Sequence, residues 1–345
     1  MPPSTVLVTG VSRFLGGHLA ARLAADPGID RVIGVDTVAP RGELLRRMGR
    51  AEFVRADIRN PLIARVIATA GVDTVVHAAM TASPRGAGGR ATMKEMNVIG
   101  TMQLLAACQT STTVTRLVVR STGAVYGASP RDPALFTEQS EPRATSASGY
   151  AKDAVEVEGY IRGFARRCDD VDVTVLRFCN LIGPRIDSVL TRYFALPVVP
   201  TVLGYDARVQ LLHEEDALAV LERAVREPLP GVFNAAGDGV LLLSQAVRRA
   251  GRVPVPVPGP ATSTVARLLR GTRLVDFSPE QTRFLNFGRV LDTTLLRTRF
   301  GFTPRWTTAQ AFDDYVAGRS LRPVVDPDRL AAVQRGVRAL AGRLP

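Results

Sequence analysis

Short runs of consecutive apolar residues alternate with stretches of helical periodicity through the first half of the chain. In VLVTG at 6–10 and RVIGVD at 31–36, apolar residues occupy successive positions, which indicates strands buried on both faces. Strand, helix and strand in repeated order predict a parallel sheet with right-handed crossovers. We therefore expect an α/β fold with a Rossmann-type doubly wound parallel sheet. Its first strands are expected near 6–10, 31–36, 52–57, 73–79, 116–121 and 173–178.

This rhythm changes after about residue 180, where prolines and glycines become frequent. The segment 211–225 still predicts a strand that leads into a helix, and 231–237 predicts one further strand. We expect residues 1–184 to form the main domain, with its sheet completed by about 209–238.

The proline-rich remainder predicts a second, smaller unit. Residues 185–208 and 239–325 are expected to form a small C-terminal lobe that binds the substrate. The last residues, 326–345, have an apolar stripe at helical spacing and predict an amphipathic helix. This helix is expected to dock on its own domain, with a partner protein or a membrane surface as alternatives.

Composition excludes several classes of protein. The chain has 345 residues, of which 46% are hydrophobic and 22% charged, the balance of a globular protein. No apolar run reaches the roughly 18 residues of a membrane-spanning helix. The N-terminal residues lead directly into a strand without a signal-peptide pattern, so we expect a cytoplasmic protein. Three cysteines and three histidines show no metal-ligand spacing, and no metal site is expected.

The net charge of +12 narrows the choice of partner. Of the 44 basic residues, all but Lys94 and Lys152 are arginines, and they are spread along the chain. No basic stripe with interleaved aromatic residues is present, so nucleic acid is not the expected partner. A positive surface equally suits an anionic small molecule.

The strongest local signal is the segment VLVTGVSRFLGG at 6–17. A strand that enters a glycine turn and opens a helix places backbone amides around a pyrophosphate. Asp36 stands twenty residues after Gly16, at the end of the next strand, where a carboxylate binds the adenosine ribose of NAD and repels the phosphate of NADP. NAD is therefore the expected cofactor. The residues expected around its phosphates are Gly10, Ser12, Arg13, Phe14, Leu15 and Gly16.

Seven further segments follow one another in the order of a known family. These segments are ADIRNP, VVHAAM, NVIGTMQLLAAC, STGAVYG, LRFCNLIGPR, LLHEEDAL and LDTTLLRTRFGFTPRW. With the glycine turn, they resemble the extended branch of the short-chain dehydrogenase/reductase superfamily. The chain is similar to its NAD-dependent nucleotide-sugar epimerases and dehydratases, such as UDP-glucose 4-epimerases. A shared family does not by itself determine the reaction.

The resemblance assigns roles to residues at matching positions. It implies that Thr122 supplies a catalytic hydroxyl and that Asn180 lies near the sugar nucleotide. It also implies a homodimer with helices 95–108 and 150–166 at the interface. The further cofactor-lining positions that it implies are Asp57, Ile58, His77, Ala78, Ala79 and Asn97.

One departure from the family pattern lies in the phosphate loop. The family has glycines at three-residue intervals, but Arg13 occupies the middle position. Its guanidinium could clamp a phosphate, because a planar fork matches phosphate oxygens. The alternative is an arginine that points to solvent from a turn that tolerates it.

A second departure concerns the catalytic pair Tyr-x-x-x-Lys. Tyr150 is present, but the expected lysine position is Ala154, and Lys152 is two residues from the tyrosine. Helical residues two apart point in different directions, so Lys152 is not expected to replace it. Tyr150 is either the catalytic base or an aromatic residue that packs on the cofactor. The chain is correspondingly either an epimerase or dehydratase, or a nucleotide-binding protein that has lost catalysis.

The chain also departs from the family pattern at the position expected to contact the substrate. Family members that act on nucleoside diphosphate sugars have an arginine where this chain has Val209, next to Arg208. Arg208 would replace it only with a shift of strand register, because neighbouring strand residues face opposite sides. Arg185, Arg192 and Arg289 are further candidates for a pyrophosphate contact, and the alternative for each is a solvated surface arginine.

Overall fold

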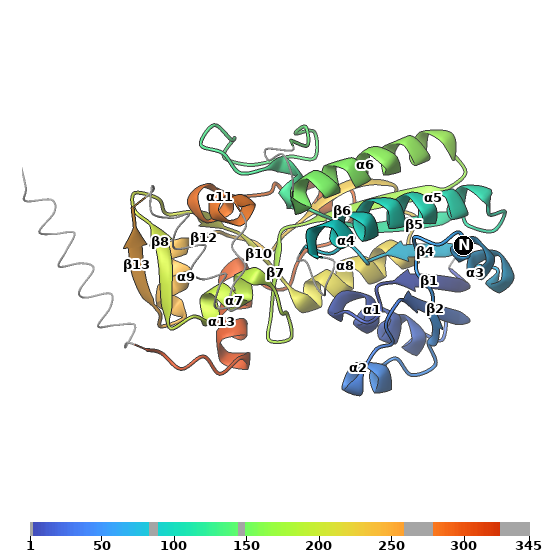
Figure 1. The fold of residues 1–345 in the computed structure, drawn as a ribbon, viewed down its shortest axis with the longest axis horizontal. Helices are drawn as coiled ribbons and strands as arrows, with labels where there is room; N and C mark the ends of the chain where they lie inside the picture. The colour runs from blue at the N-terminus through green and yellow to red at the C-terminus, as the bar shows by residue number, and fades with distance from the viewer. Residues whose placement is uncertain (1–2, 83–88, 144–148, 259–278, 325–345) are drawn as a thin grey trace, which may run out of the picture.

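The computed structural model, shown in Figure 1, describes residues 3–82, 89–143, 149–258 and 279–324. The predicted parallel sheet is confirmed: seven strands are arranged in the order β11-β6-β5-β4-β1-β2-β3, and each neighbouring pair is parallel. The strands are β1 (Thr5–Thr9), β2 (Arg31–Asp36), β3 (Glu52–Arg55), β4 (Thr74–His77), β5 (Arg116–Thr122), β6 (Asp172–Phe178) and β11 (Gly231–Ala235).

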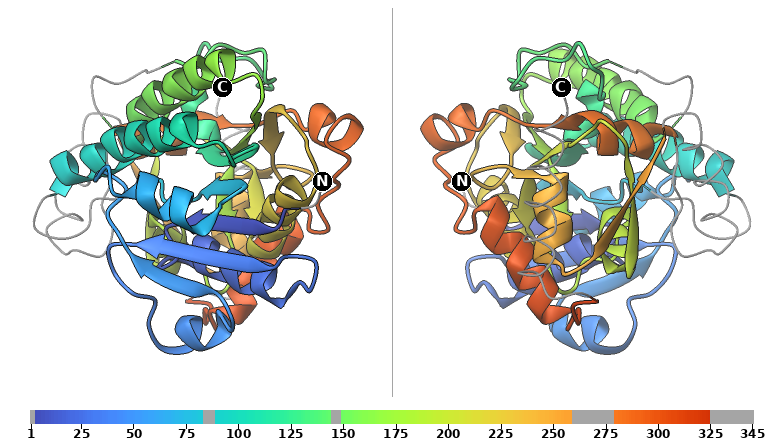
Figure 2. Two further views of the ribbon diagram at one scale, coloured as in Figure 1. Left: turned by 90° about the vertical axis from the view of Figure 1, so that its right-hand side faces the viewer. Right: turned by 90° about the vertical axis from the view of Figure 1, so that its left-hand side faces the viewer.

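Helices cover both faces of this sheet, as the end-on views in Figure 2 show. One face carries α1 (Phe14–Ala25) and α8 (Glu214–Arg226). The other face carries α3 (Ile63–Ala70), α5 (Gly100–Thr110) and α6 (Tyr150–Arg167). The connecting elements are α2 (Gly42–Arg47), α4 (Gly89–Lys94), the π-helix η1 (Glu95–Ile99) and the 3₁₀ helix η2 (Gly123–Tyr126).

The two-sided core explains why the strands are continuously apolar. In β1, Val6 and Val8 pack towards α1 and α8, whereas Leu7 packs towards α3 and α5. All three side chains are fully buried. A strand whose successive side chains enter different cores has no polar face, and this fold class follows from that pattern.

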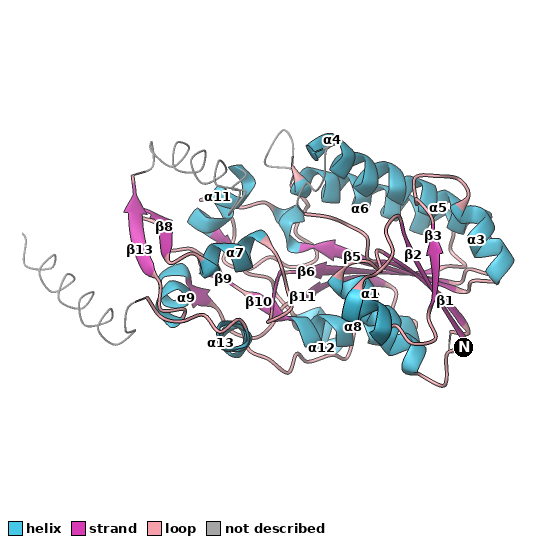
Figure 3. Ribbon diagram, turned by 60° about the horizontal axis from the view of Figure 1, so that its bottom comes forward, coloured by secondary structure: helices cyan, strands magenta, loops and turns pink. Residues whose placement is uncertain are grey.

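The remaining elements form a smaller region around a third apolar cluster, at the left of Figure 3. Its strands make short sheets in the orders β10-β7, β12-β9-β14 and β13-β8. The strands are β7 (Asn180–Ile182), β8 (Val198–Val202), β9 (Arg208–Val209), β10 (Leu211–His213), β12 (Leu241–Leu242), β13 (Val253–Val257) and β14 (Gly288–Arg289). The helices are α7 (Val189–Ala195), α9 (Leu243–Arg249), α11 (Pro279–Phe287), α12 (Thr294–Thr298) and α13 (Thr308–Gly318).

The chain returns to the large sheet near its C-terminal end. Helix α12 lies against β11, and Leu296 and Phe300 join the apolar cluster under α1 and α8. The part expected as a separate lobe therefore also contributes to the main core. The division into domains stays a prediction, and the helix expected at 326–345 lies outside the described residues.

Candidate functional site

The phosphate loop between β1 and α1 brings backbone from three segments close together. Gly10 has φ +77°, and a Cβ atom there would lie 2.8 Å from the Cα of Ala79. A Cβ atom on Gly16 would lie 2.5 Å from the carbonyl oxygen of Gly10. Both positions therefore require glycine, the first for its conformation and for space, and the second for space.

The first turn of α1 leaves several amides open. Its N-cap residue, Arg13, makes no side-chain cap. Among the described residues, the amides of Phe14, Leu15 and Gly16 have no hydrogen-bond acceptor. Open amides at a helix N-terminus attract an anion because they add to the positive end of the helix dipole.

Asp36 is tied directly to this loop. Its carboxylate accepts hydrogen bonds from the amide of Ser12 at 3.0 Å and from the Ser12 hydroxyl at 2.7 Å. The end of β2 is thereby fixed beside the phosphate loop, which is the placement that the sequence predicted for a ribose-binding carboxylate.

The Arg13 side chain extends from the phosphate loop to the segment that follows β4. Its guanidinium donates to the hydroxyl of Thr81, in the segment that follows β4. Asn97 holds Thr81 in turn, because its side chain accepts from the Thr81 amide at 2.9 Å and donates to the Thr81 carbonyl at 3.0 Å. The prediction that Arg13 simply points to solvent is therefore wrong, and the phosphate clamp stays a prediction.

His77 has a structural environment. Its imidazole is buried between Thr9, 3.0 Å from Nδ1, and Thr101, 2.9 Å from Nε2. Burial, assisted by the charge of Arg120, lowers the pKa of His77 to about 4, so the ring is neutral at physiological pH. With both nitrogens in use, contact with a ligand at this strand end would fall to the backbone of Ala78 and Ala79.

The expected adenine-side residues lie after β3. Asp57 accepts from the guanidinium of Arg59 at 2.6 Å, and this hydrogen bond lowers the pKa of Asp57. Ile58 is buried, and its side chain lies 2.8 Å from where a Cβ atom of Gly100 would be. The cofactor roles predicted for Asp57 and Ile58 stay predictions.

Thr122 and Tyr150 lie on elements that pack together. Thr122 ends β5 and caps η2 by accepting from the amide of Ala124 at 3.1 Å. Tyr150 begins α6, which packs against β5 and η2. The Tyr150 hydroxyl is buried, and among the described residues it has no hydrogen-bond partner.

Helix α6 carries no basic side chain where the family has its lysine. Ala154 is fully buried, one turn after Tyr150, whereas Lys152 is exposed. Between them, Asp153 is fully buried and paired with Arg90 of α4. Arg90 donates to both carboxylate oxygens, at 2.6 and 2.5 Å, and to the carbonyl of Gly149 at 2.8 Å.

The Arg90–Asp153 pair was not predicted from the sequence. The two residues are 63 positions apart, and no local pattern connects them. Asn97 also donates to Asp153, at 3.3 Å. A polar chain therefore runs from Arg13 through Thr81, Asn97 and Asp153 to Arg90, from the phosphate loop to the start of α6.

A second buried ion pair connects α6 to strands β5 and β6 beside the site. Glu158, two turns after Tyr150, accepts from Arg177 at 2.6 Å and from the hydroxyl of Ser121 at 2.6 Å. Arg177 also donates to the Tyr126 hydroxyl at 2.7 Å. The eight-residue spacing from Tyr150 is a signal that could have identified Glu158, because it places both residues on one helix face.

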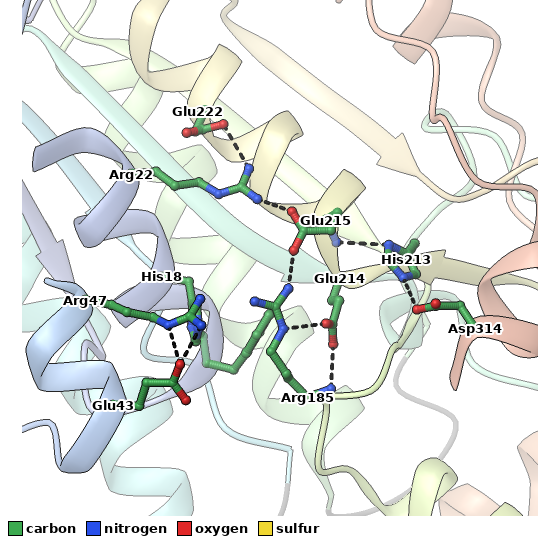
Figure 4. A network of polar contacts seen from close by, with 11 residues as sticks. His18, Arg22, Glu43, Arg47, Arg185, His213, Glu214, Glu215, Glu222 and Asp314 are labelled. Carbon is green, nitrogen blue, oxygen red and sulfur yellow. Dashed lines mark hydrogen bonds and ion pairs between the residues drawn. The ribbon is translucent and has the colours of Figure 1, made fainter. Parts of the chain in front are cut away.

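Arg185, predicted to contact the substrate, is held elsewhere. Figure 4 shows it between Glu214 and Glu215 at the start of α8; its Nε donates to Glu214 at 2.6 Å. Its guanidinium also lies 5.1 Å from the ring of Phe14. Two carboxylates already use this charge, which argues against a substrate contact.

The other substrate candidates lie on the short strands. Arg208 donates to the carbonyl of Ala134 at 3.1 Å, while Val209 is fully buried. Arg192 pairs with Asp187 at 2.5 Å on the surface. Asn180 is partly buried at the start of β7, and its role stays a prediction.

Among the described residues, no group of three or more histidine, cysteine or acidic side chains could hold a metal ion. No helix in that part of the chain is long and apolar enough to cross a membrane.

A model of the NAD dependent epimerase/dehydratase family matches residues 6–236. The chain belongs to this family. An uncharacterized protein of Mycobacterium tuberculosis (strain ATCC 25618 / H37Rv) is 53% identical over 341 residues, which are 99% of this chain and 91% of the relative.

Solved structures share the fold of this epimerase/dehydratase chain. The dTDP-glucose 4,6-dehydratase of Bacillus anthracis, in complex with NAD, has a TM-score of 0.71 at 19% identity, covering 92% of this chain and 96% of that one. The UDP-glucose 4-epimerase of Thermotoga maritima, with UDP-glucose, has a TM-score of 0.69 at 21% identity, covering 91% and 98%. At these identities the likeness establishes the fold.

Within this NAD-dependent family, the chain retains one half of the site and changes the other. The glycine turn, the open amides of α1 and Asp36 form a cradle that fits a dinucleotide: Gly10 and Gly16 let the backbone pack closely, and the amides of Phe14, Leu15 and Gly16 are left for a phosphate. At the start of α6, Ala154 and the buried Asp153 replace the expected lysine arrangement.

Proposed function

We propose that this chain binds NAD and acts on a nucleotide sugar, as an epimerase or dehydratase that works by transient hydride transfer. The cofactor part rests on the open amides of Phe14, Leu15 and Gly16 and on the carboxylate of Asp36 beside them. A carboxylate at the end of β2 binds ribose hydroxyls and repels a 2′-phosphate, which favours NAD over NADP.

The buried hydroxyl of Tyr150, which has no hydrogen-bond partner among the described residues, carries the catalytic part of the proposal. A buried polar group without a partner costs about 1–3 kcal/mol, and a ligand hydroxyl would remove that cost. Thr122, at the end of the strand against which α6 packs, supplies a second hydroxyl. An arrangement of two hydroxyls is suited to hold a sugar hydroxyl and to move its proton.

In this mechanism Thr122 hydrogen-bonds the oxygen of the reacting sugar hydroxyl, and Tyr150 takes its proton and later returns it. When bound, NAD supplies a hydride acceptor for the sugar carbon. Ala154 stands where the family has its lysine, so no cation one helical turn after Tyr150 assists this proton transfer. The mechanism therefore predicts slow turnover.

The alternative function is a nucleotide-binding protein without catalysis. Ala154 favours it, because no positive charge stands one turn after Tyr150 on its own helix face. The buried Asp153, neutralised by Arg90, adds no net positive charge nearby. Under this alternative, Tyr150 packs on the cofactor and the Arg90–Asp153 pair only positions the helix.

Tyr150→Phe distinguishes the two functions, with Tyr160→Phe on the exposed face of the same helix as the matched control. Thermal shift with NAD, NADP, UDP-sugars and dTDP-sugars identifies ligands, and product analysis measures turnover. For an enzyme, Tyr150→Phe lowers turnover by about 10²–10⁴-fold and the control does not. Ligand binding without turnover in the wild type would support the alternative, and turnover indifferent to Tyr150→Phe would place the base elsewhere.

A homodimer is the second part of the proposal. Ile99 in η1, Met102 in α5 and Tyr160 in α6 are exposed on the helices expected at the interface. A symmetric pairing of one apolar patch is the usual route to such dimers. Light scattering at micromolar concentration is expected to give twice the mass of the chain, and a monomer would contradict this expectation.

A further inference from the structure

Arg289 lies beside the end of β5, although it comes from a distant part of the chain. Its Cδ lies 3.6 Å from where a Cβ atom of Gly123 would be, and Gly123 directly follows Thr122. Its Nε donates to the carbonyl of Gly127 at 2.7 Å. The guanidinium carbon lies 5.6 Å from the centre of the Phe284 ring. Arg289 is therefore fixed against both ends of η2.

This guanidinium forms no ion pair with a carboxylate among the described residues, and its hydrogen bond there goes to a backbone carbonyl. The acidic groups that influence its charge, Glu280 and Asp132, each accept from a backbone amide instead, Ala151 at 2.9 Å and Ser129 at 2.6 Å. Burial lowers the pKa of Arg289 to about 10, and the group stays charged at neutral pH.

Other buried arginines of this chain have their charge or their terminal nitrogens engaged. Arg177 is paired with Glu158. Arg116 and Arg252 have no carboxylate partner in the described residues, but a terminal nitrogen of each donates to a backbone carbonyl. Both terminal nitrogens of Arg289 lack a protein acceptor in this part of the chain, and neither is sealed from solvent. A partly buried charge without an ion-pair partner is costly unless an anion binds it.

We propose that Arg289 binds an oxyanion of the substrate next to the reacting sugar hydroxyl; this inference rests on the proposed function and specifies its ligand. The contact of the Arg289 side chain with Gly123 connects it to the residue that directly follows Thr122. A carboxylate on the sugar ring, as in a uronic acid, and a phosphate oxygen of the nucleotide share the required chemistry. Either accepts two hydrogen bonds from a planar guanidinium fork.

Binding to the NAD-saturated protein tests the proposal, with Arg289→Gln as the variant and Arg299→Gln as the control. Arg299 matches it closely: its guanidinium lies 5.8 Å from the Phe233 ring centre and donates to the carbonyl of Pro230, away from η2. The probes are UDP-glucuronic acid, UDP-glucose, UDP and inorganic pyrophosphate, and NAD affinity checks that each variant is folded.

Arg289→Gln is expected to weaken binding at least about tenfold, while Arg299→Gln leaves it unchanged. A loss confined to UDP-glucuronic acid identifies a sugar carboxylate, and an equal loss for all UDP ligands identifies the diphosphate. Equal affinity of wild type and Arg289→Gln for every probe overturns the proposal. If no UDP ligand binds the wild type, an Arg289-dependent response to pyrophosphate supports the anion site while the proposed function fails. A response to pyrophosphate that does not depend on Arg289, or none, overturns both.

Discussion

The two halves of the candidate site are built from different materials. On the cofactor side, the groups that would contact the ligand are mostly backbone amides, held by the close packing of Gly10, Gly16 and Ala79. On the reaction side, the chemistry depends on side chains, Tyr150 and its neighbours on α6. The first half keeps the family pattern almost completely, and the second replaces its lysine with alanine.

This difference shows that the cofactor-binding backbone can be retained while the side-chain chemistry beside it changes. Backbone amides at a helix start persist as long as the turn is preserved, and Arg13 changes the side chain there without removing the amides. A single side-chain replacement is enough to remove the charge beside Tyr150. In this part of α6 the buried charge belongs instead to Asp153, which is paired with Arg90 of α4.

The largest expected effect comes from breaking that pair. Arg90→Ala leaves Asp153 charged and buried, so we expect the free energy of unfolding to fall by about 3–5 kcal/mol. Arg47→Ala, which breaks an exposed pair with Glu43 one helical turn away, is the control and is expected to cost about 0.3–0.5 kcal/mol. Urea denaturation measures both. Equal losses would show that the α6 pair is not a structural element of the reaction side.

A pH dependence tests the core beneath the cofactor side. The pKa of His77 in the folded protein, about 4, is below its ordinary value of 6.5, so His77 favours folding fully above pH 6.5 and less as the pH falls towards 4. The loss over this range is about 3 kcal/mol. Stability at pH 7.5 and at pH 4 should therefore differ more in the wild type than in His77→Gln. The same pH dependence in both proteins would contradict a buried neutral imidazole.

The close backbone packing that forms the cofactor cradle can be disrupted by one methyl group. Gly10→Ala introduces a Cβ atom 2.8 Å from the Ala79 backbone, and we expect NAD affinity to fall at least about tenfold. Gly42→Ala shares the positive φ but meets no atom within 4 Å. The control should lose about 1 kcal/mol of stability and keep its affinity. Calorimetric titration with NAD measures the affinity of both variants. A loss of affinity in Gly10→Ala alone is due to the contact with Ala79, because both variants place alanine at a positive φ.

The smallest expected effect concerns the choice of cofactor. Asp36→Asn removes the charge that opposes a 2′-phosphate, and the preference for NAD over NADP should narrow by about tenfold, or about 1.4 kcal/mol. Asp26→Asn, at the other end of α1, should leave the preference unchanged. If the wild type bound NADP as tightly as NAD, Arg13 rather than Asp36 would determine cofactor choice.

Much of the main fold could be read from local patterns. The continuous apolar runs identified all seven strands of the large sheet, because a strand between two cores leaves no polar periodicity. The small region was harder to predict, since β9, β12 and β14 have two residues each and take their register from neighbours distant in sequence. The return of α12 to the main sheet was missed for the same reason.

The candidate site divides along similar lines. Gly10, Gly16 and Asp36 could be proposed as cofactor residues because they follow one another at fixed spacing within one strand–helix–strand unit. For Arg185 the sequence left a substrate contact and a surface arginine open, because nothing near it in sequence indicated that Glu214 and Glu215 would hold its guanidinium. Arg289 was one of several equal candidates until its position beside Gly123 set it apart.

The sequence by itself determined the doubly wound sheet, the phosphate loop and the missing lysine, because each depends on residues close together in the chain. Only the tertiary structure decided which charges are paired. Ion pairs form between side chains that folding brings together, such as Arg90 with Asp153, and their spacing in sequence is unconstrained. For the same reason, only the folded chain shows that the Arg289 side chain lies against Gly123, which follows Thr122, without a carboxylate partner among the described residues.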